Sequence, residues 1–345
     1  MPHLIFVPAT AAPDTSGDLA SQTSMALASV DKRLRADRSS LADALVITVY
    51  LKRAADFPAM NDAYKQAFKS APPTRTTVVT EPLAAGALVE IAAIAAPTGA
   101  DRRVVHPSSW MASPNPYSYG IRSGELLFLS GLIARNGKDN TLVTGDVAAQ
   151  TRAVMENARE ILDAAGLSFP HLVSARAFLP NLQDFAEFNR VYREFVGADR
   201  PARATVGATL TSPSYNVEIT FVASAATRQA IETSDQPNPN LSAAVRAGDS
   251  LFVSGMLAEG EALKGDAGPQ ARDIVRKIDT VATKAGFARG DVRDLLVYVT
   301  DESAATAAVE QCRSAFGARP AVTPVKVALA AEGARVEIMT YLERA

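Results

Sequence analysis

One phrase occurs three times in this chain of 345 residues, each time at a fixed distance from a second phrase. "PTRTTV" carries Arg75 and precedes "LVEIAAIA" with Glu90, while "PARATV" carries Arg203 and precedes "NVEITFVA" with Glu218. From the first copy to the second, both landmarks move by 128 residues. From the second to the third, "PAVTPV" and "RVEIMTYL" move by 119 residues, and Val322 replaces the arginine. Equal offsets at separate landmarks indicate three copies of one domain.

A third landmark extends this register. "GDLASQT", "GDVAAQT" and "GDAGPQA" are each followed, 28 residues after their last residue, by the end of an apolar run. We therefore expect domains at residues 1–97, 114–226 and 238–345. The first domain begins at a run that matches the second strand of the other copies, so it lacks the first strand. The proline- and serine-rich stretches between domains are typical of linkers. We expect the linker run "RRVVH", residues 102–106, to cover the sheet edge that the missing strand leaves bare.

The second copy shows the order of elements within a domain. Two short apolar runs broken at Ser123–Gly124 predict a hairpin. Helical spacing then predicts a helix from Asp146, its N-cap, to Gly166, and "LQDFAEFNRVYREFVG" predicts a second helix after an intervening strand. The order β-β-α-β-α-β-β predicts an α+β fold with both helices on one face of the sheet. The other face needs a partner, which the three copies can supply to one another.

Composition excludes several classes of function. The chain is 48% hydrophobic and 21% charged with a formal net charge of −2, as in a soluble globular protein. It has no dense basic cluster, which argues against nucleic-acid binding, although one buried arginine could still bind a small anion. A single cysteine, Cys312, and three scattered histidines exclude an intrachain disulfide and disfavour a metal site. The N-terminal apolar run is too short for a signal peptide or a membrane span, so we expect a cytoplasmic protein without membrane contact.

The motifs "NPYSYGIRSGELLFLSG", "GDVAAQTRAVMENAREILDAAG", "DFAEFNRVYREF", "PARATV" and "VEI" resemble those of the Rid/YjgF family of reactive-intermediate deaminases, also labelled L-PSP endoribonucleases. The resemblance implies a chorismate mutase-like fold. Family members are usually homotrimers with ligand pockets between subunits. The resemblance therefore also implies that this chain is a trimer written as one polypeptide, monomeric in solution. The implied chemistry is hydrolysis of small 2-imino or enamino acids to 2-oxo acids and ammonia, with no cofactor and no metal.

The resemblance also carries site residues onto this sequence. The family arginine matches Arg203 and Arg75, and its strand glutamate matches Glu218, Glu90 and Glu337. Its N-terminal tyrosine matches Tyr117, whereas the third copy has Leu241. Its Ser-Gly pair matches Ser130–Gly131 and Ser254–Gly255, whereas the first copy has Pro8–Ala9. Its helical asparagine and tyrosine match Asn189 and Tyr192 in the second copy and Asn61 and Tyr64 in the first, whereas the third copy has Val309 and Cys312.

These residue types suit the implied chemistry. A guanidinium stays charged and binds a carboxylate through two parallel hydrogen bonds, which suits Arg203 or Arg75 to hold an imino acid. Glu218 could position and deprotonate the attacking water or simply pair with the arginine. Tyr117 could close the pocket, and Ser130 and Gly131 could offer backbone groups to the substrate. Each helix tyrosine could reach a neighbouring pocket or belong to the core.

The distribution of these residues ranks the copies. We expect the second copy to hold the best-equipped site, with Arg203, Glu218 and Tyr117 as its catalytic residues. The first copy, with Arg75 and Glu90, would be damaged or altered, and the third a scaffold. The leading interpretation is an imine/enamine hydrolase acting on a small anionic substrate. A non-catalytic carboxylate-binding or regulatory protein is the alternative, and an RNA-cleaving or translation-inhibiting protein is disfavoured by the charge balance.

Overall fold

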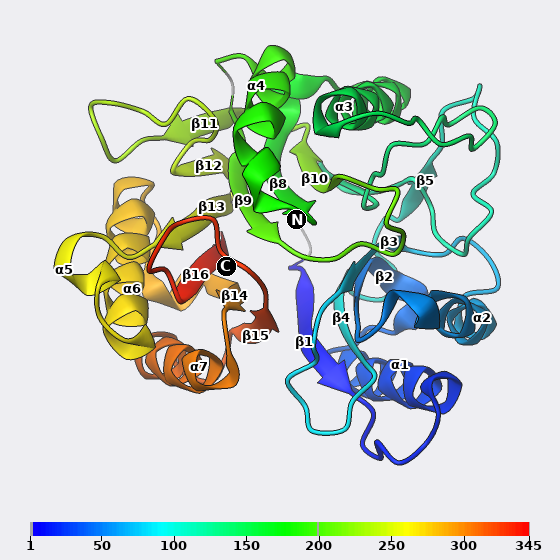
Figure 1. Ribbon diagram of the computed structural model, residues 1–345, viewed down its shortest axis with the longest axis horizontal. Helices are drawn as coiled ribbons and strands as arrows, with labels where there is room; N and C mark the ends of the chain where they lie inside the picture. Colours follow the sequence, from blue (N-terminus) through cyan, green and yellow to red (C-terminus); the bar gives the residue numbers. More distant parts are fainter. Residues whose placement is uncertain (1–2, 199, 345) are drawn as a thin grey trace.

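The computed structural model describes residues 3–198 and 200–344 and contains three similar α+β units arranged as a ring (Figure 1). The first unit contains β1 (Ile5–Ala11), α1 (Leu19–Ala36), β2 (Ala44–Leu51), α2 (Phe57–Ala67), β3 (Thr74–Val79) and β4 (Val89–Ala95). The second contains β5 (Arg103–Val105), β6 (Gly120–Ser123), β7 (Leu126–Leu129), α3 (Val147–Ala164), β8 (Leu172–Leu179), α4 (Phe185–Val196), β9 (Ala202–Gly207) and β10 (Glu218–Ser224). The third contains β11 (Arg228–Ile231), β12 (Ala244–Ala247), β13 (Ser250–Leu257), α5 (Gly260–Leu263), α6 (Ala267–Lys284), β14 (Val292–Val299), α7 (Glu302–Phe316), β15 (Ala321–Lys326) and β16 (Val336–Glu343). We call these units repeats one, two and three.

Each repeat forms its own sheet. The strand orders are β1-β4-β2-β3, β5-β6-β7-β10-β8-β9 and β11-β12-β13-β16-β14-β15. In every sheet the last pair, such as β8 and β9, is parallel and the other pairs are antiparallel. The helices lie on the outside of the ring and the strands on the inside (Figure 1). This confirms the predicted β-β-α-β-α-β-β order in repeats two and three, its shortened form in repeat one, and the intramolecular pseudo-trimer.

The recurring Gly-Asp phrase starts the first long helix of each repeat. Asp18 and Asp146 are N-caps whose carboxylates accept hydrogen bonds from backbone N–H groups of the first turn, at 2.9 Å in both cases. The glutamine four residues after each aspartate is buried and reaches the loop before the last strand. Gln150, for example, donates to the carbonyl of Ser214 at 2.8 Å and accepts from the N–H of Asn216 at 2.8 Å. The phrase therefore recurs because it fastens this loop to the helix in every copy.

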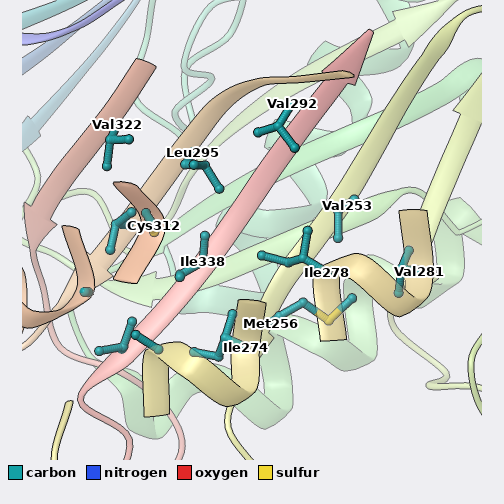
Figure 2. Packing of buried hydrophobic residues seen from close by; sticks show 14 of the residues in the cluster. Val253, Met256, Ile274, Ile278, Val281, Val292, Leu295, Cys312, Val322 and Ile338 are labelled. Atoms are coloured by element: carbon teal, nitrogen blue, oxygen red, sulfur yellow. The ribbon is translucent and has the colours of Figure 1, made fainter. Parts of the chain in front are cut away.

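Apolar side chains fill two kinds of core. In each repeat, one cluster lies between the sheet and its own helices. Figure 2 shows the cluster of repeat three, which contains Val322, Cys312, Ile338, Leu295 and Ile274. Two further clusters join the inner faces of the three sheets, one containing Phe128 and Phe252 and the other Tyr50, Phe178 and Tyr298. The sheet faces that carry no helices therefore bury one another, as expected from the sequence.

The linkers contribute strands that the sequence reading missed. β5 pairs with β6 and β11 with β12, each extending the edge of the sheet that follows it. The expectation that residues 102–106 would cover the edge of repeat one is therefore wrong. Val105 lies opposite Gly120 of repeat two because that sheet also has a free edge, directly beside the linker. No helix in the described residues is long and apolar enough to cross a membrane.

Candidate functional site

Arg75 of repeat one lies at the junction with repeat two. Its backbone N–H donates to the hydroxyl of Ser130 at 2.9 Å, and its carbonyl accepts from the N–H of Gly131 at 3.0 Å. The Ser130 hydroxyl in turn donates to the carbonyl of Ser118 at 2.7 Å. Thr76, the next residue of β3, shares a 2.8 Å hydrogen bond with Thr220 of β10. These bonds hold the arginine strand of one repeat against the Ser-Gly corner of the next.

The Arg75 side chain is buried in an aromatic cage. Its guanidinium carbon lies 5.5 Å from the ring centre of Phe57, 4.9 Å from that of Tyr64 and 5.6 Å from that of Tyr117. Nη1 donates to the amide oxygen of Asn61 at 2.8 Å. Burial lowers the pKa of Arg75, but an arginine remains charged in proteins. Such a desolvated cation attracts an anionic ligand strongly because little water screens it.

Glu218 of β10 completes this junction. A Cβ added to Gly131 would lie 1.9 Å from Oε1 of Glu218 and 3.1 Å from the hydroxyl of Thr76, so the carboxylate sits directly over the glycine backbone. Burial raises the pKa of Glu218 to about 8, opposed by a backbone hydrogen bond from Thr77 and by the charges of Arg75 and Arg176. A carboxyl group that titrates near neutral pH is suited to accept and return a proton.

Tyr117 covers the junction from the segment before β6. Its ring is half-buried against Arg75, and burial raises the pKa of its hydroxyl. Together with Gly131 and Arg135 it also lines a small neighbouring cavity of about 30 Å³. Asn115, two residues earlier, accepts from the side-chain amide of Asn61 at 3.0 Å. This segment therefore closes over the arginine and fixes the asparagine that binds it.

A second junction repeats the arrangement between repeats two and three. The N–H of Arg203 donates to the hydroxyl of Ser254 at 2.8 Å, and a Cβ on Gly255 would lie 1.8 Å from Oε1 of Glu337. Burial raises the pKa of Glu337 to about 8, with Arg203 opposing the shift. Nη2 of Arg203 donates to Asn189 at 2.6 Å.

The Arg203 side chain is buried with unused hydrogen-bonding capacity. Its guanidinium carbon lies 5.2 Å from the Phe188 ring centre and 4.6 Å from that of Tyr192. Nε and Nη1 have no hydrogen-bond partner among the described residues. Leu241 stands in the sequence where the first junction has Tyr117, and Phe188 and Tyr192 are the only rings over this guanidinium among the residues that the structure describes.

The third junction lacks the arginine, and its glutamate is bound elsewhere. Val322 replaces the arginine and packs with Cys312 in the core of repeat three (Figure 2). Repeat one offers Pro8 and Ala9 in place of Ser-Gly, and the Ala9 N–H donates to the hydroxyl of Thr323 at 3.3 Å. The carboxylate of Glu90 instead accepts from the N–H groups of Leu83 and Ala84, at 3.3 and 3.1 Å.

Ala9 explains the different position of Glu90. At the other two junctions the glutamate carboxylate occupies the space that a Cβ would need, and alanine has that Cβ. The first repeat can therefore not hold its glutamate over the backbone as Gly131 and Gly255 allow. Burial raises the pKa of Glu90, but its carboxyl group binds backbone N–H groups of the loop before β4.

The junctions correct the predicted grouping of residues. Arg203 was expected to share a site with Glu218 and Tyr117 of the same copy, but those two residues lie with Arg75. The reason is that each arginine strand pairs with the Ser-Gly corner and last strand of the following repeat. The best-equipped site therefore takes its arginine from repeat one, and Glu337, which lacks an arginine in its own copy, receives Arg203.

Two further expectations change in detail. The N–H groups of Ser130 and Gly131 already donate to the carbonyls of Tyr119 and Arg75, so they are not available to a substrate. Tyr64 and Tyr192 are fully buried core residues, and their rings also contact the arginines. Each tyrosine therefore belongs to the core and reaches the arginine site as well.

The sequence reading missed two contributors to the first junction. Phe57 and Asn115 were not identified, although Phe57 occupies the same place at the start of its helix as Phe185 does in repeat two. A search for aromatic residues repeated at the established offset could have found it. Across the residues that the structure describes, no group of three or more His, Cys, Asp or Glu side chains could hold a metal ion.

Comparison with known proteins agrees with the repeats. The family model described as Endoribonuclease L-PSP matches three times, at residues 7–97, 108–225 and 232–343. A RutC family protein of Pyrococcus horikoshii is 38% identical over 108 residues, covering 31% of this chain and 86% of the relative. Protein DfrA of Myxococcus xanthus is 41% identical over 125 residues, covering 35% and 95%.

Two further similarities concern a named enzyme and the whole fold. A protein of Dermatophagoides farinae named 2-iminobutanoate/2-iminopropanoate deaminase is 33% identical over 104 residues, covering 30% of this chain and 81% of the relative. A crystal structure of chorismatase matches 99% of this chain and 98% of its own with a TM-score of 0.63, and at 16% identity it shows similarity of fold alone. The three family matches cover most of the sequence, and so the chain belongs to the endoribonuclease L-PSP family, also called Rid or YjgF, and contains three copies of its domain.

Proposed function

We propose that this protein hydrolyses small 2-imino or enamino acids to 2-oxo acids and ammonia at the junction of repeats one and two. The observation that carries the proposal is the buried Arg75, held by Asn61 and facing Glu218 and Tyr117 from the neighbouring repeat. The relative named as a 2-iminobutanoate/2-iminopropanoate deaminase supports the choice of reaction.

The residues divide the reaction between binding and proton transfer. The substrate carboxylate displaces the Tyr117 ring from the guanidinium and pairs with Arg75, which places C2 near Glu218. When the imine nitrogen is protonated, Glu218 takes a proton from water while the water oxygen bonds to C2 and the C=N π electrons move to nitrogen, which gives a neutral carbinolamine. Glu218 then gives that proton to the amino nitrogen and takes the hydroxyl proton as the C–N bond breaks. Ammonia leaves, C2 becomes a carbonyl carbon, and Glu218 finally releases one proton to the solvent. One water is consumed, and a 2-oxo acid and ammonia are formed.

The test generates 2-iminobutyrate in situ with an amino-acid oxidase and follows its loss in the presence of the purified protein. Faster release of 2-oxobutyrate than in buffer supports hydrolysis. Binding of 2-oxobutyrate without any acceleration would instead favour the carboxylate-binding alternative. RNA cleavage that depends on Arg75, with no effect on the imine, would overturn the proposal in favour of the activity that the family name states.

We also propose that the active species is a single chain. All three junctions form within one polypeptide, so no second copy is needed to complete the Arg75 site. Light scattering should give the mass of one chain at assay concentrations. A threefold larger mass would contradict this assembly.

A further inference from the structure

The three sheets surround two adjoining cavities on the inside of the ring, and neither cavity is lined by Arg75 or Arg203. Their volumes are about 90 and 40 Å³. Both are lined by Phe6, Val46, Ile94, Arg176, Asp294 and Leu296, which come from all three repeats. Since a water molecule takes roughly 30 Å³ of the liquid and an apolar cavity of about 150 Å³ holds benzene, the two together suit a molecule of about six non-hydrogen atoms. We call them the axial cavity.

The chain places different residues at equivalent positions around this cavity. The inner strands β2, β8 and β14 each have eight residues, so their positions correspond one to one. Val46, Ser174 and Asp294 form one layer, and the next layer contains Thr48, Arg176 and Leu296. A symmetric trimer would bring three like charges together at either position, at a high cost in a low-dielectric interior. A chain with unequal repeats can instead present one cation and one anion.

Arg176 and Asp294 face the cavity without forming a contact ion pair. Both are half-buried, and among the described side chains their charged atoms are not within ion-pair distance of each other or of another partner. They nevertheless interact: burial raises the pKa of Asp294 to about 7 and Arg176 opposes the shift. The hydroxyl of Thr340, which also lines the larger cavity, is buried without a hydrogen-bond partner. Opposite charges and an unused hydroxyl therefore surround a space with largely apolar walls.

We propose that the axial cavity binds a small zwitterion, an α-amino acid with a short aliphatic side chain. Its carboxylate pairs with Arg176, its ammonium group pairs with Asp294, and its side chain lies against the apolar wall that includes Phe128 and Phe252. Each half-buried charge then gains an oppositely charged contact partner, which no described side chain supplies. This site does not contain Arg75, and the proposal does not rest on the reaction at that junction, although the charge of Arg176 also acts on Glu218.

The test is calorimetric titration with L-2-aminobutyrate, propionate and propylamine, which share a short chain and differ in charge. We expect saturable binding of the amino acid and about tenfold or weaker binding of each singly charged analogue. Arg176→Thr and Asp294→Ser install the residues found at the equivalent positions of other repeats. Each should reduce amino-acid binding about tenfold or more, to the level of a singly charged analogue, whereas the exposed Arg190→Thr should not.

Further variants and a structure separate this site from the arginine junctions. Amino-acid binding should persist in Arg75→Ala and Arg203→Ala, and its loss there would assign it to a junction and overturn the proposal. Unchanged binding in both Arg176→Thr and Asp294→Ser would also overturn it. If a variant fails to fold, crystals of the parent protein soaked with L-2-aminobutyrate decide: ligand density between Arg176 and Asp294 supports the site, and solvent alone there contradicts it.

Discussion

The Arg75 and Arg203 junctions are built from the same parts and differ in what closes over them. In both, the side chain of a buried arginine donates to an asparagine and its backbone N–H donates to a serine hydroxyl. In both, a glutamate carboxylate lies over a glycine. Only the first has Tyr117 against the guanidinium, where the second has Leu241 in sequence. The Ser, Gly and Glu residues also fasten neighbouring repeats together, so their presence alone does not identify a working site. The residue that closes the pocket separates the two junctions better.

The largest difference between the junctions should follow replacement of the glutamates. Glu218→Gln removes the proposed base and should reduce turnover about 10²- to 10⁴-fold, whereas Glu337→Gln should change it little. In the parent protein the rate should rise with pH as the carboxyl group ionises and level off above its pKa of about 8. Initial rates between pH 6 and about 9 measure both effects. Equal losses in the two variants would show that both junctions work.

Replacement of the arginines should give the next largest difference. Arg75→Ala removes the charged partner of the substrate carboxylate and should cost about 2–4 kcal/mol, roughly a 30- to 1000-fold loss of kcat/KM. Arg203→Ala is the matched control, since its arginine is equally buried and makes the same type of backbone bond. Steady-state kinetics with 2-iminobutyrate measure the two losses. A larger loss of kcat/KM in Arg203→Ala than in Arg75→Ala would indicate that the second junction is the active site.

Glycine replacements should affect stability alike and activity differently. Gly131→Ala and Gly255→Ala each add a Cβ within 2 Å of a glutamate oxygen and should destabilise the fold by about 1–3 kcal/mol. Only Gly131→Ala should reduce turnover, by roughly tenfold, because it displaces Glu218. Chemical denaturation and imine hydrolysis measure the two effects. A stable Gly131→Ala variant with full activity would remove Glu218 from the mechanism.

The smallest difference should appear in the pH dependence of stability. Glu218 and Glu337 both have a pKa raised from 4.5 to about 8 by burial, so the folded protein binds more protons than the unfolded chain between these values. Their contribution to stability is therefore complete below pH 4.5 and is lost as the pH rises to about 8. Glu218→Gln and Glu337→Gln should each reduce the loss of stability between these pH values, by similar amounts. Melting temperatures across this pH range measure the effect. An unchanged pH dependence of the melting temperature in both variants would show that burial does not raise the pKa of these two carboxyl groups.

Most of the fold could be predicted from the sequence because each repeat is marked by local patterns. The Asp146 cap and the break at Ser123–Gly124 are each visible within one copy, and the equal offsets come from comparing the copies. The structure contains the cap, the break and the three repeats. The strand at 103–105 was missed because three residues in a polar linker show no alternation, and pairing with β6 is what makes them a strand.

The grouping of the site residues was beyond the sequence because it depends on contacts between copies. Register shows that Arg75 and Arg203 are equivalent, but it does not show which corner each arginine strand meets. That is decided where β3 lies against Ser130 and β9 against Ser254. The role of Gly131 was hidden for the same reason, since only the packed glutamate shows why a side chain is excluded there.

The covalent link between repeats one and two has a consequence for dilution. Arg75 and Glu218 belong to the same chain, so the two halves of their site meet at a local concentration set by the linker, of millimolar order for a short flexible one. A site shared between separate subunits is lost when the protein is diluted below the dissociation constant of the assembly. Here the encounter is unimolecular, and the site should persist at concentrations where a trimer of separate domains would come apart.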